Sequence, residues 1–146
     1  MLDTNVVSEL RKPQRDPQVL AWVDAQQPLS LFLSVVTLAE IRYGIELLAS
    51  DDLRRSRLEL WLAEDLRPWF ADRLFGIDED VLVTGRRLAG RSRALRVAFL
   101  QPDLFIAATA LHHDLCVVTR NVSDFIAAGV PVLNPWTDTE PRPPAN

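Results

Sequence analysis

The chain has 146 residues, 48% of them hydrophobic, and a net charge of −4 from 20 acidic and 16 basic side chains. This composition suits one compact globular domain with a substantial core, and it gives no chain-wide basic signature of nucleic-acid binding. The apolar runs are far shorter than the roughly 20 residues of a membrane span. No secretory signal is visible, and the single cysteine, Cys116, excludes an internal disulfide framework. We therefore expect a cytoplasmic protein with no membrane segment.

Short apolar runs that are typical of buried strands alternate along the chain with longer helical segments. Strands are expected at residues 1–3, 30–36, 73–77, 115–119 and 130–134. This alternation predicts an α/β domain with a mainly parallel sheet of about five strands. The domain is expected to span residues 1–136, followed by a polar, proline-rich tail at 137–146.

Signals for helix starts and ends lie between the predicted strands. Asp16 followed by Pro17 is an N-cap with proline at the first helical position. Thr37 and Glu40 form a T-x-x-E capping box, which predicts a helix that begins after Thr37. Further helices are expected at 51–67 (ended by Pro68), at 78–96, at 103–114 and just before Gly129.

Four acidic residues fall near predicted strand ends or helix starts: Asp3, Glu40, Asp103 and Asp124. Ligands of an open parallel sheet bind outside the carboxyl ends of its strands, so these acids are candidates for one shared site. Each acid also has a purely structural interpretation, because an acid at a helix start caps the helix or interacts well with its dipole. Four carboxylates at one edge would repel each other unless they shared a cation. Oxygen ligands alone indicate Mg²⁺ or Mn²⁺ rather than zinc.

Carboxylates gathered around a divalent cation favour phosphoryl chemistry. The glycine-rich motifs of nucleotide-binding proteins, GxxxxGK[ST] and GxGxxG, do not occur. A basic strip lies on the helix predicted at 78–96, where five arginines fall within eleven residues: Arg86, Arg87, Arg91, Arg93 and Arg96. This strip either faces the phosphates of RNA or is a solvated helix face.

Segments spread in order over nearly the whole chain resemble the PIN-domain family. They are "LDTNVVSEL" at the start, "SVVTLAEIRYGI" at 34–45, "QPDLFIAATAL" at 101–111 and "VVTRNVSDF" at 117–125. With "GVPVLNPW" at 129–136, they look like the VapC-type toxins of bacterial toxin–antitoxin pairs, including the FitB-like branch. The resemblance implies a three-layer α/β/α domain that forms a homodimer, binds Mg²⁺ or Mn²⁺ and cleaves RNA. It also implies a small antitoxin partner with a DNA-binding N-terminal part.

The resemblance implies roles for particular residues. By position in the motifs, the metal-binding and catalytic acids are Asp3, Glu40, Asp103 and Asp124. Asn121 lies close enough in sequence to fill the fourth position in place of Asp124. Asn5 and Thr119 are expected to orient ligands or water. Family members usually carry a few more apolar residues before the first motif, which leaves open either a short first strand or an upstream start.

The sequence therefore supports one leading hypothesis, a toxin that is a metal-dependent endoribonuclease and hydrolyses phosphodiester bonds of RNA. Two alternatives remain open: a toxin that acts mainly as a binding partner and co-repressor with its antitoxin, and a DNA-processing nuclease. Trp61, Leu62 and Trp69 resemble exposed apolar residues of a partner surface, although core packing explains them equally well.

Overall fold

The computed structural model describes residues 1–94 and 101–143, with only the backbone for residues 92–94 and 101. Its helices are α1 (Thr4–Leu10), α2 (Pro17–Asp24), α3 (Val35–Glu46), α4 (Leu53–Trp61), α5 (Arg67–Trp69), α6 (Glu79–Ala94), α7 (Gln101–His112) and α8 (Val122–Ala127). Shorter helical segments are the 3-10 turns η1 (Pro28–Ser30) and η3 (Ala71–Arg73) and the π-helical segment η2 (Leu62–Leu66). The strands are β1 (Leu33–Ser34), β2 (Leu74–Phe75), β3 (Val117–Val118) and β4 (Val132–Leu133).

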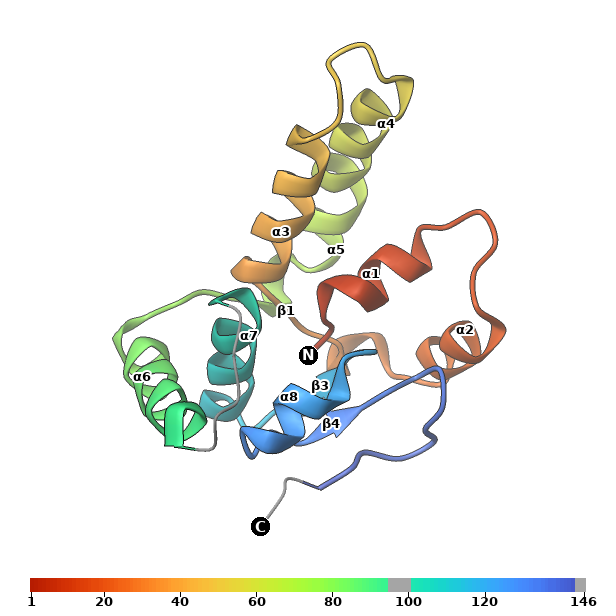
Figure 1. Cartoon of the computed structure of the whole chain (residues 1–146). Coiled ribbons are helices and arrows are strands. Elements are labelled where there is room, and N and C mark those ends of the chain that lie inside the picture. Colours follow the sequence, from red (N-terminus) through yellow and green to blue (C-terminus); the bar gives the residue numbers. More distant parts are fainter. Residues whose placement is uncertain (95–100, 144–146) are drawn as a thin grey trace.

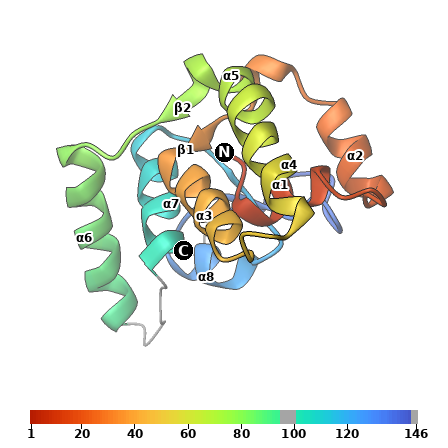
Figure 2. The same ribbon diagram turned by 90° about the horizontal axis from the view of Figure 1, so that it is seen from above.

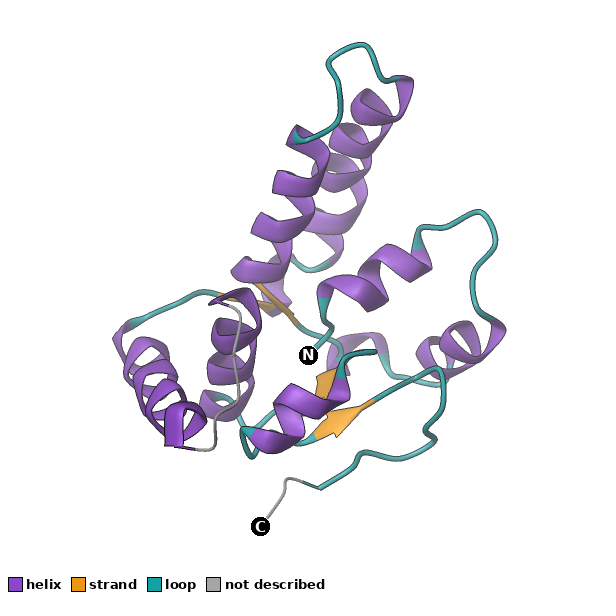
Figure 3. Ribbon diagram, in the orientation of Figure 1, coloured by secondary structure: helices purple, strands orange, loops and turns teal. Residues whose placement is uncertain are grey.

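The strands form two parallel pairs, β1 with β2 and β3 with β4, and the N-terminal segment joins the pairs. Leu2 N donates to Phe32 O (2.9 Å) on one side, and Asp3 N donates to Val118 O (3.0 Å) on the other. The prediction of a parallel α/β domain is thus confirmed, but the prediction of about five strands is not, since four short strands are present in the described residues (Figure 3). Residues 1–3 contribute a single bridge, between Leu2 and Val118, because α1 begins at once at Thr4.

Helices cover both faces of the strands. The side chains of the strands therefore alternate between two buried cores. Residues facing α1, α2, α3 and η2 are Leu2, Leu33, Val118 and Leu133. Residues facing α6, α7 and α8 are Met1, Val117 and Val132. This period of two is the side-chain geometry of an extended strand, and burial on both faces explains why the strand sequences are apolar throughout.

Two helix predictions have different outcomes. Asp16 caps α2 as expected, since its carboxylate accepts hydrogen bonds from the backbone of Gln18 (2.9 Å) and Val19 (3.4 Å). The prediction that Thr37 and Glu40 form a capping box is wrong. Helix α3 begins at Val35, and the hydroxyl of Ser34 accepts the capping bond from Val36 N (3.1 Å).

The helix predicted at 51–67 is interrupted and shifted by two residues, since the helical stretch begins at Leu53 and ends at Trp69, and Pro68 does not end it. Helix α4 passes into the π-helical segment η2, and the chain stays helical through Pro68 to Trp69. Proline has no backbone N–H and its ring crowds the carbonyl four residues earlier, so a wider π turn just before Pro68 accommodates it.

Helices α3 and α4 form an arm that extends from the strands, and α6 lies along α7 (Figures 1 and 2).

The C-terminal part turns into the sheet at Gly129 and is bridged to it again at Arg142. Gly129, with a φ of +77°, makes the turn between α8 and β4, a backbone conformation that favours glycine. Arg142 forms an antiparallel bridge with Val132, and its guanidinium pairs with Asp138 (2.6 Å). None of the helices in the described ranges is long and apolar enough to cross a membrane.

Candidate active site

Asp3 lies at the point where the N-terminal segment ends and α1 begins, and it is almost fully buried. One carboxylate oxygen accepts Thr4 N (2.7 Å), which caps the helix. The other accepts the hydroxyl of Thr119 (2.6 Å) and the amide of Asn5 (2.6 Å). Burial raises the pKa of Asp3, while these hydrogen bonds to its charged form act in the opposite direction. Both expected supporting residues, Asn5 and Thr119, therefore contact Asp3 directly.

Glu40 faces α1 instead of capping its own helix. Its carboxylate accepts a hydrogen bond from the hydroxyl of Thr4. Burial raises the pKa of Glu40, with a smaller contribution from the negative charge of Asp3, whereas the bond from Thr4 lowers it. Thr4 is thus a site residue that the sequence interpretation missed, although its place directly after Asp3 is a signal that could have found it.

Asp103 lies in the first turn of α7 and is half-buried. Burial, followed by the charges of Asp3, Glu40 and Asp124, raises the pKa of Asp103 to about 6, against a hydrogen bond from Asn121. Segments far apart in the chain therefore bring Asp3, Glu40 and Asp124 close enough to Asp103 to affect its ionisation. Asn121 lies in the same cluster, and its amide also donates to Asp124 (3.4 Å).

The donor set of this cluster fits a hard divalent cation, because it offers carboxylate oxygens whose mutual repulsion such an ion would relieve. Among the described residues, however, no three histidine, cysteine or acidic side chains are close enough to surround one ion. Hydrogen bonds from Thr4, Asn5 and Thr119 hold the oxygens of Asp3 and Glu40 where they are. Among the described residues, the cluster is therefore a set of candidate ligands in which three have not yet closed around one point.

The predicted basic strip lies on α6, the helix that packs on α7 (Figure 1). The side chains of Arg86, Arg87 and Arg91 are exposed. The side chain of Arg93 and the whole of Arg96 lie outside the described residues.

Residues 1–129 match the family model described as "PIN domain". The chain belongs to the PIN-domain family. This PIN domain is 38% identical to "VapC ribonuclease Y4jK" of Sinorhizobium fredii, covering 93% of this chain and 96% of that protein. It is 37% identical to "Toxin FitB" of Neisseria gonorrhoeae, covering 94% and 99%. The resemblance to VapC-type and FitB-like toxins read from the motifs is thus confirmed.

Solved structures agree with this assignment. FitAcB from Neisseria gonorrhoeae superposes with a TM-score of 0.87 at 37% identity, covering 93% of this PIN domain and 97% of that chain. A "Toxin-antitoxin complex from Klebsiella pneumoniae" superposes with a TM-score of 0.65 at 25% identity, covering 92% and 96%.

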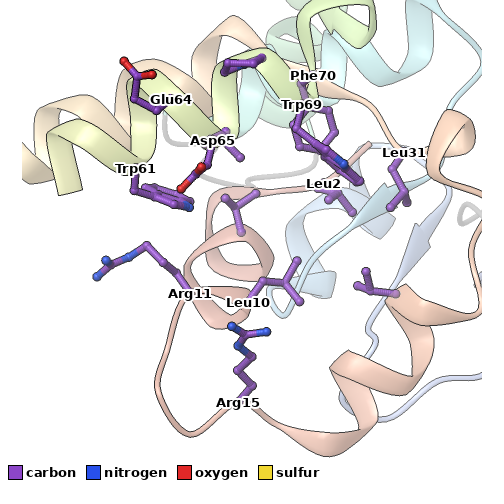
Figure 4. A pocket seen from close by; sticks show the side chains of 14 residues that line it. Leu2, Leu10, Arg11, Arg15, Leu31, Trp61, Glu64, Asp65, Trp69 and Phe70 are labelled. Carbon is purple, nitrogen blue, oxygen red and sulfur yellow. The ribbon is translucent and has the colours of Figure 1, made fainter. Parts of the chain in front are cut away.

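A groove of about 770 Å³ lies between α1, α2 and the segment from Trp61 to Phe70 of this PIN domain, and none of the four candidate site acids is among its lining residues (Figure 4). Its walls are mostly apolar, and Trp61 and Trp69 both line it. Leu62, in contrast, is only 6% exposed and packs in the core, so the partner-surface interpretation is wrong for that residue. Charged side chains border the groove, with Arg11 and Arg15 on one side and Glu64 and Asp65 on the other.

Proposed function

We propose that this protein is a metal-dependent endoribonuclease and the toxin of a toxin–antitoxin pair. The observation that carries the proposal is the convergence of Asp3, Glu40 and Asp124 on Asp103, which they affect from separate segments of the chain. The names of the relatives, a VapC ribonuclease and a toxin, support RNA as the substrate and toxicity as the outcome.

In this proposal Asp3 and Asp103 hold a Mg²⁺ or Mn²⁺ ion most directly, and Glu40 and Asp124 complete the ligand set or orient the attacking water. When bound, such an ion lowers the pKa of a coordinated water and offsets the charge on the leaving oxygen. Thr119 and Asn5 fix the orientation of the Asp3 carboxylate through their hydrogen bonds. No side chain serves as a covalent nucleophile.

The exposed arginines of α6 are proposed to face the phosphates of the RNA, beside the helix that carries Asp103. Each phosphate contact adds to the salt dependence of binding, so neutralising several arginines should weaken RNA binding and flatten its salt dependence. The variant for this test replaces Arg87, Arg91 and Arg93 by glutamine together. Unchanged affinity and unchanged salt dependence would leave the strip as a solvated helix face.

The decisive experiment incubates the purified, antitoxin-free protein with total RNA and maps the cleaved ends. We expect cleavage with Mg²⁺ or Mn²⁺ and none with EDTA. Asp3→Asn and Asp103→Asn should abolish cleavage while circular dichroism shows an unchanged fold, whereas Asp72→Asn, outside the cluster, should cleave normally. If either cluster variant cleaves RNA like the parent, the site assignment fails. Digestion of DNA in place of RNA under the same conditions would instead support the DNA-processing nuclease.

The partner is proposed to be a small antitoxin encoded by the neighbouring gene, with a DNA-binding N-terminal part that allows the pair to act as a repressor. The toxin–antitoxin complex among the structural neighbours favours such a partner. An apolar segment of the antitoxin would fill the groove lined by Trp61 and Trp69. Trp69→Asp should then weaken co-purification with that small protein and leave RNA cleavage intact. Sedimentation of the toxin alone tests the implied homodimer.

A further inference from the structure

Arg120 lies directly beside the residues that hold Asp3. Its backbone N–H donates to the side-chain oxygen of Asn5 (3.1 Å), and the amide of Asn5 donates to Asp3 (2.6 Å). The preceding residue, Thr119, donates its hydroxyl to the same Asp3 oxygen (2.6 Å). The main chain of Arg120 is thus part of the hydrogen-bond network that positions the acid cluster.

The side chain of Arg120 is exposed and lies on an aromatic face. Its guanidinium carbon is 5.0 Å from the centroid of the Trp136 ring. Trp136 is half-buried against the core, and its backbone N–H donates to the side chain of Asn134 (3.0 Å). A cation over a fixed indole is attracted to the ring and loses freedom, so Trp136 restrains the guanidinium.

The described residues leave the hydrogen-bond donors of this guanidinium unused. Within the part of the chain that the structure describes, no acceptor takes a hydrogen bond from it, whereas Arg54, Arg55 and Arg142 each pair with an acid. Its charge contributes to lowering the pKa of Glu9, but Lys12 already pairs with that carboxylate (2.6 Å). Arg120 therefore presents a positive charge and a planar set of donors to an incoming ligand.

Contacts of Arg120 with α1 indicate where this cation lies relative to the acids. The charge of Arg120 acts on Glu9, which lies on α1 six residues after the N-cap residue Asp3. Six helical residues rise about 9 Å, and the backbone of Arg120 is bonded to Asn5 (3.1 Å), so the residue lies beside the first turns of α1, next to the acid cluster. A polyanion that binds at the acids and extends along α1 would meet this cation.

We propose that Arg120, restrained by Trp136, binds a backbone phosphate of the RNA strand next to the phosphate that is cleaved. This inference rests on the proposed ribonuclease function. A phosphate is favoured over a nucleobase because the guanidinium already covers one face of the indole, while its own donors match phosphate oxygens in bidentate geometry. The cation would also offset the repulsion between the acid cluster and the strand.

The test measures RNA binding and salt dependence. The parent is Asp103→Asn protein with Mg²⁺, and the probe is a short, labelled, single-stranded RNA of mixed sequence. Arg120→Gln should weaken binding about tenfold, the size expected for a charge-assisted bond at an exposed site. It should also reduce the slope of log affinity against log salt by about 0.7, the value for one phosphate on a single strand. Arg120→Lys should fall between the two, because it keeps the charge and loses the planar donors.

Two controls separate this role from a structural one. Trp136→Phe keeps an aromatic face and should bind nearly as the parent does, whereas Trp136→Leu should lose part of the affinity at equal folded fraction. Arg57→Gln, an exposed arginine on α4, changes net charge equally and should leave both readouts unchanged. In the active protein, Arg120→Gln should raise KM more than it lowers kcat.

If the unsubstituted protein cleaves RNA, unchanged affinity and salt slope on adding Arg120→Gln to the Asp103→Asn parent would overturn this inference alone. Absence of metal-dependent cleavage by the unsubstituted protein would instead count against the proposed function, whatever the affinity of Arg120→Gln for RNA.

Discussion

Asp103→Asn is expected to stabilise the metal-free protein at neutral pH, although it should abolish cleavage. Burial and the neighbouring acids raise the pKa of Asp103 from 3.8 to about 6. If solvent screened none of it, this pKa difference would correspond to about 3 kcal/mol of unfavourable free energy for ionised Asp103 in the folded chain. Because the side chain is only half-buried, solvent screens much of it, and we expect about 1 kcal/mol.

The sign of the pH dependence follows from the direction of the shift. The pKa is higher in the folded chain, so protonation of Asp103 favours folding. That contribution is fully present below about pH 4 and is lost as the pH rises through about 6. Asparagine carries no charge at any pH, so its advantage over aspartate should grow across this window and be complete above it.

Thermal unfolding in EDTA provides the assay. Near pH 7.5, Asp103→Asn should raise Tm by about 2–4 °C, the shift that about 1 kcal/mol gives in a domain of this size. Near pH 4.5 most of the difference should vanish. Asp72→Asn, on the exposed turn η3, serves as the charge-matched control and should show no such pattern. A lower Tm at neutral pH, or an equal gain at both pH values, would refute the electrostatic reasoning.

Three further predictions use the same protein. Added Mg²⁺ or Mn²⁺ should raise the Tm of the parent more than that of Asp103→Asn; equal increases in a thermal scan would argue against Asp103 as a ligand. Thr119→Val keeps the shape but leaves Asp3 without the hydroxyl donor, so it should cost about 1–3 kcal/mol in denaturant unfolding and raise the metal concentration for half-maximal cleavage about tenfold or more. Ser34→Ala removes the cap of α3 and should cost about 1 kcal/mol, measured by urea unfolding; no loss would mean that Ser34 does not cap the helix.

Local sequence was sufficient where the competing interactions are local. Asp16 with Pro17 fixes the start of α2, because cap and proline act on the backbone of the next few residues. Asp3 likewise caps α1 through Thr4 N, one residue away. The acids could also be singled out, because each falls at a strand end or helix start and the motifs around them resemble the PIN-domain family.

Local sequence misled where a distant partner takes over a side chain. Thr37 and Glu40 have the spacing of a capping box, but the backbone is already helical at Val35, and Glu40 accepts a bond from Thr4 on another helix. The short apolar runs at 1–3 and 30–36 predicted strands along their whole length, whereas helix caps at Asp3 and Ser34 cut the extended segments short. Burial on both faces makes a run apolar without setting how much of it is extended.

The sequence by itself determined which chemistry is available, since it supplies carboxylates, amides and hydroxyls and almost no sulfur or imidazole. Only the tertiary structure decided which of these groups meet. The hydroxyl of Thr119 reaches Asp3 across 116 residues of chain, and the ring of Trp136 holds Arg120 beside them. The physical reason is that the main-chain hydrogen bonds from Asp3 N to Val118 O and from Thr119 N to Leu133 O set these segments side by side, a pairing that no local pattern encodes.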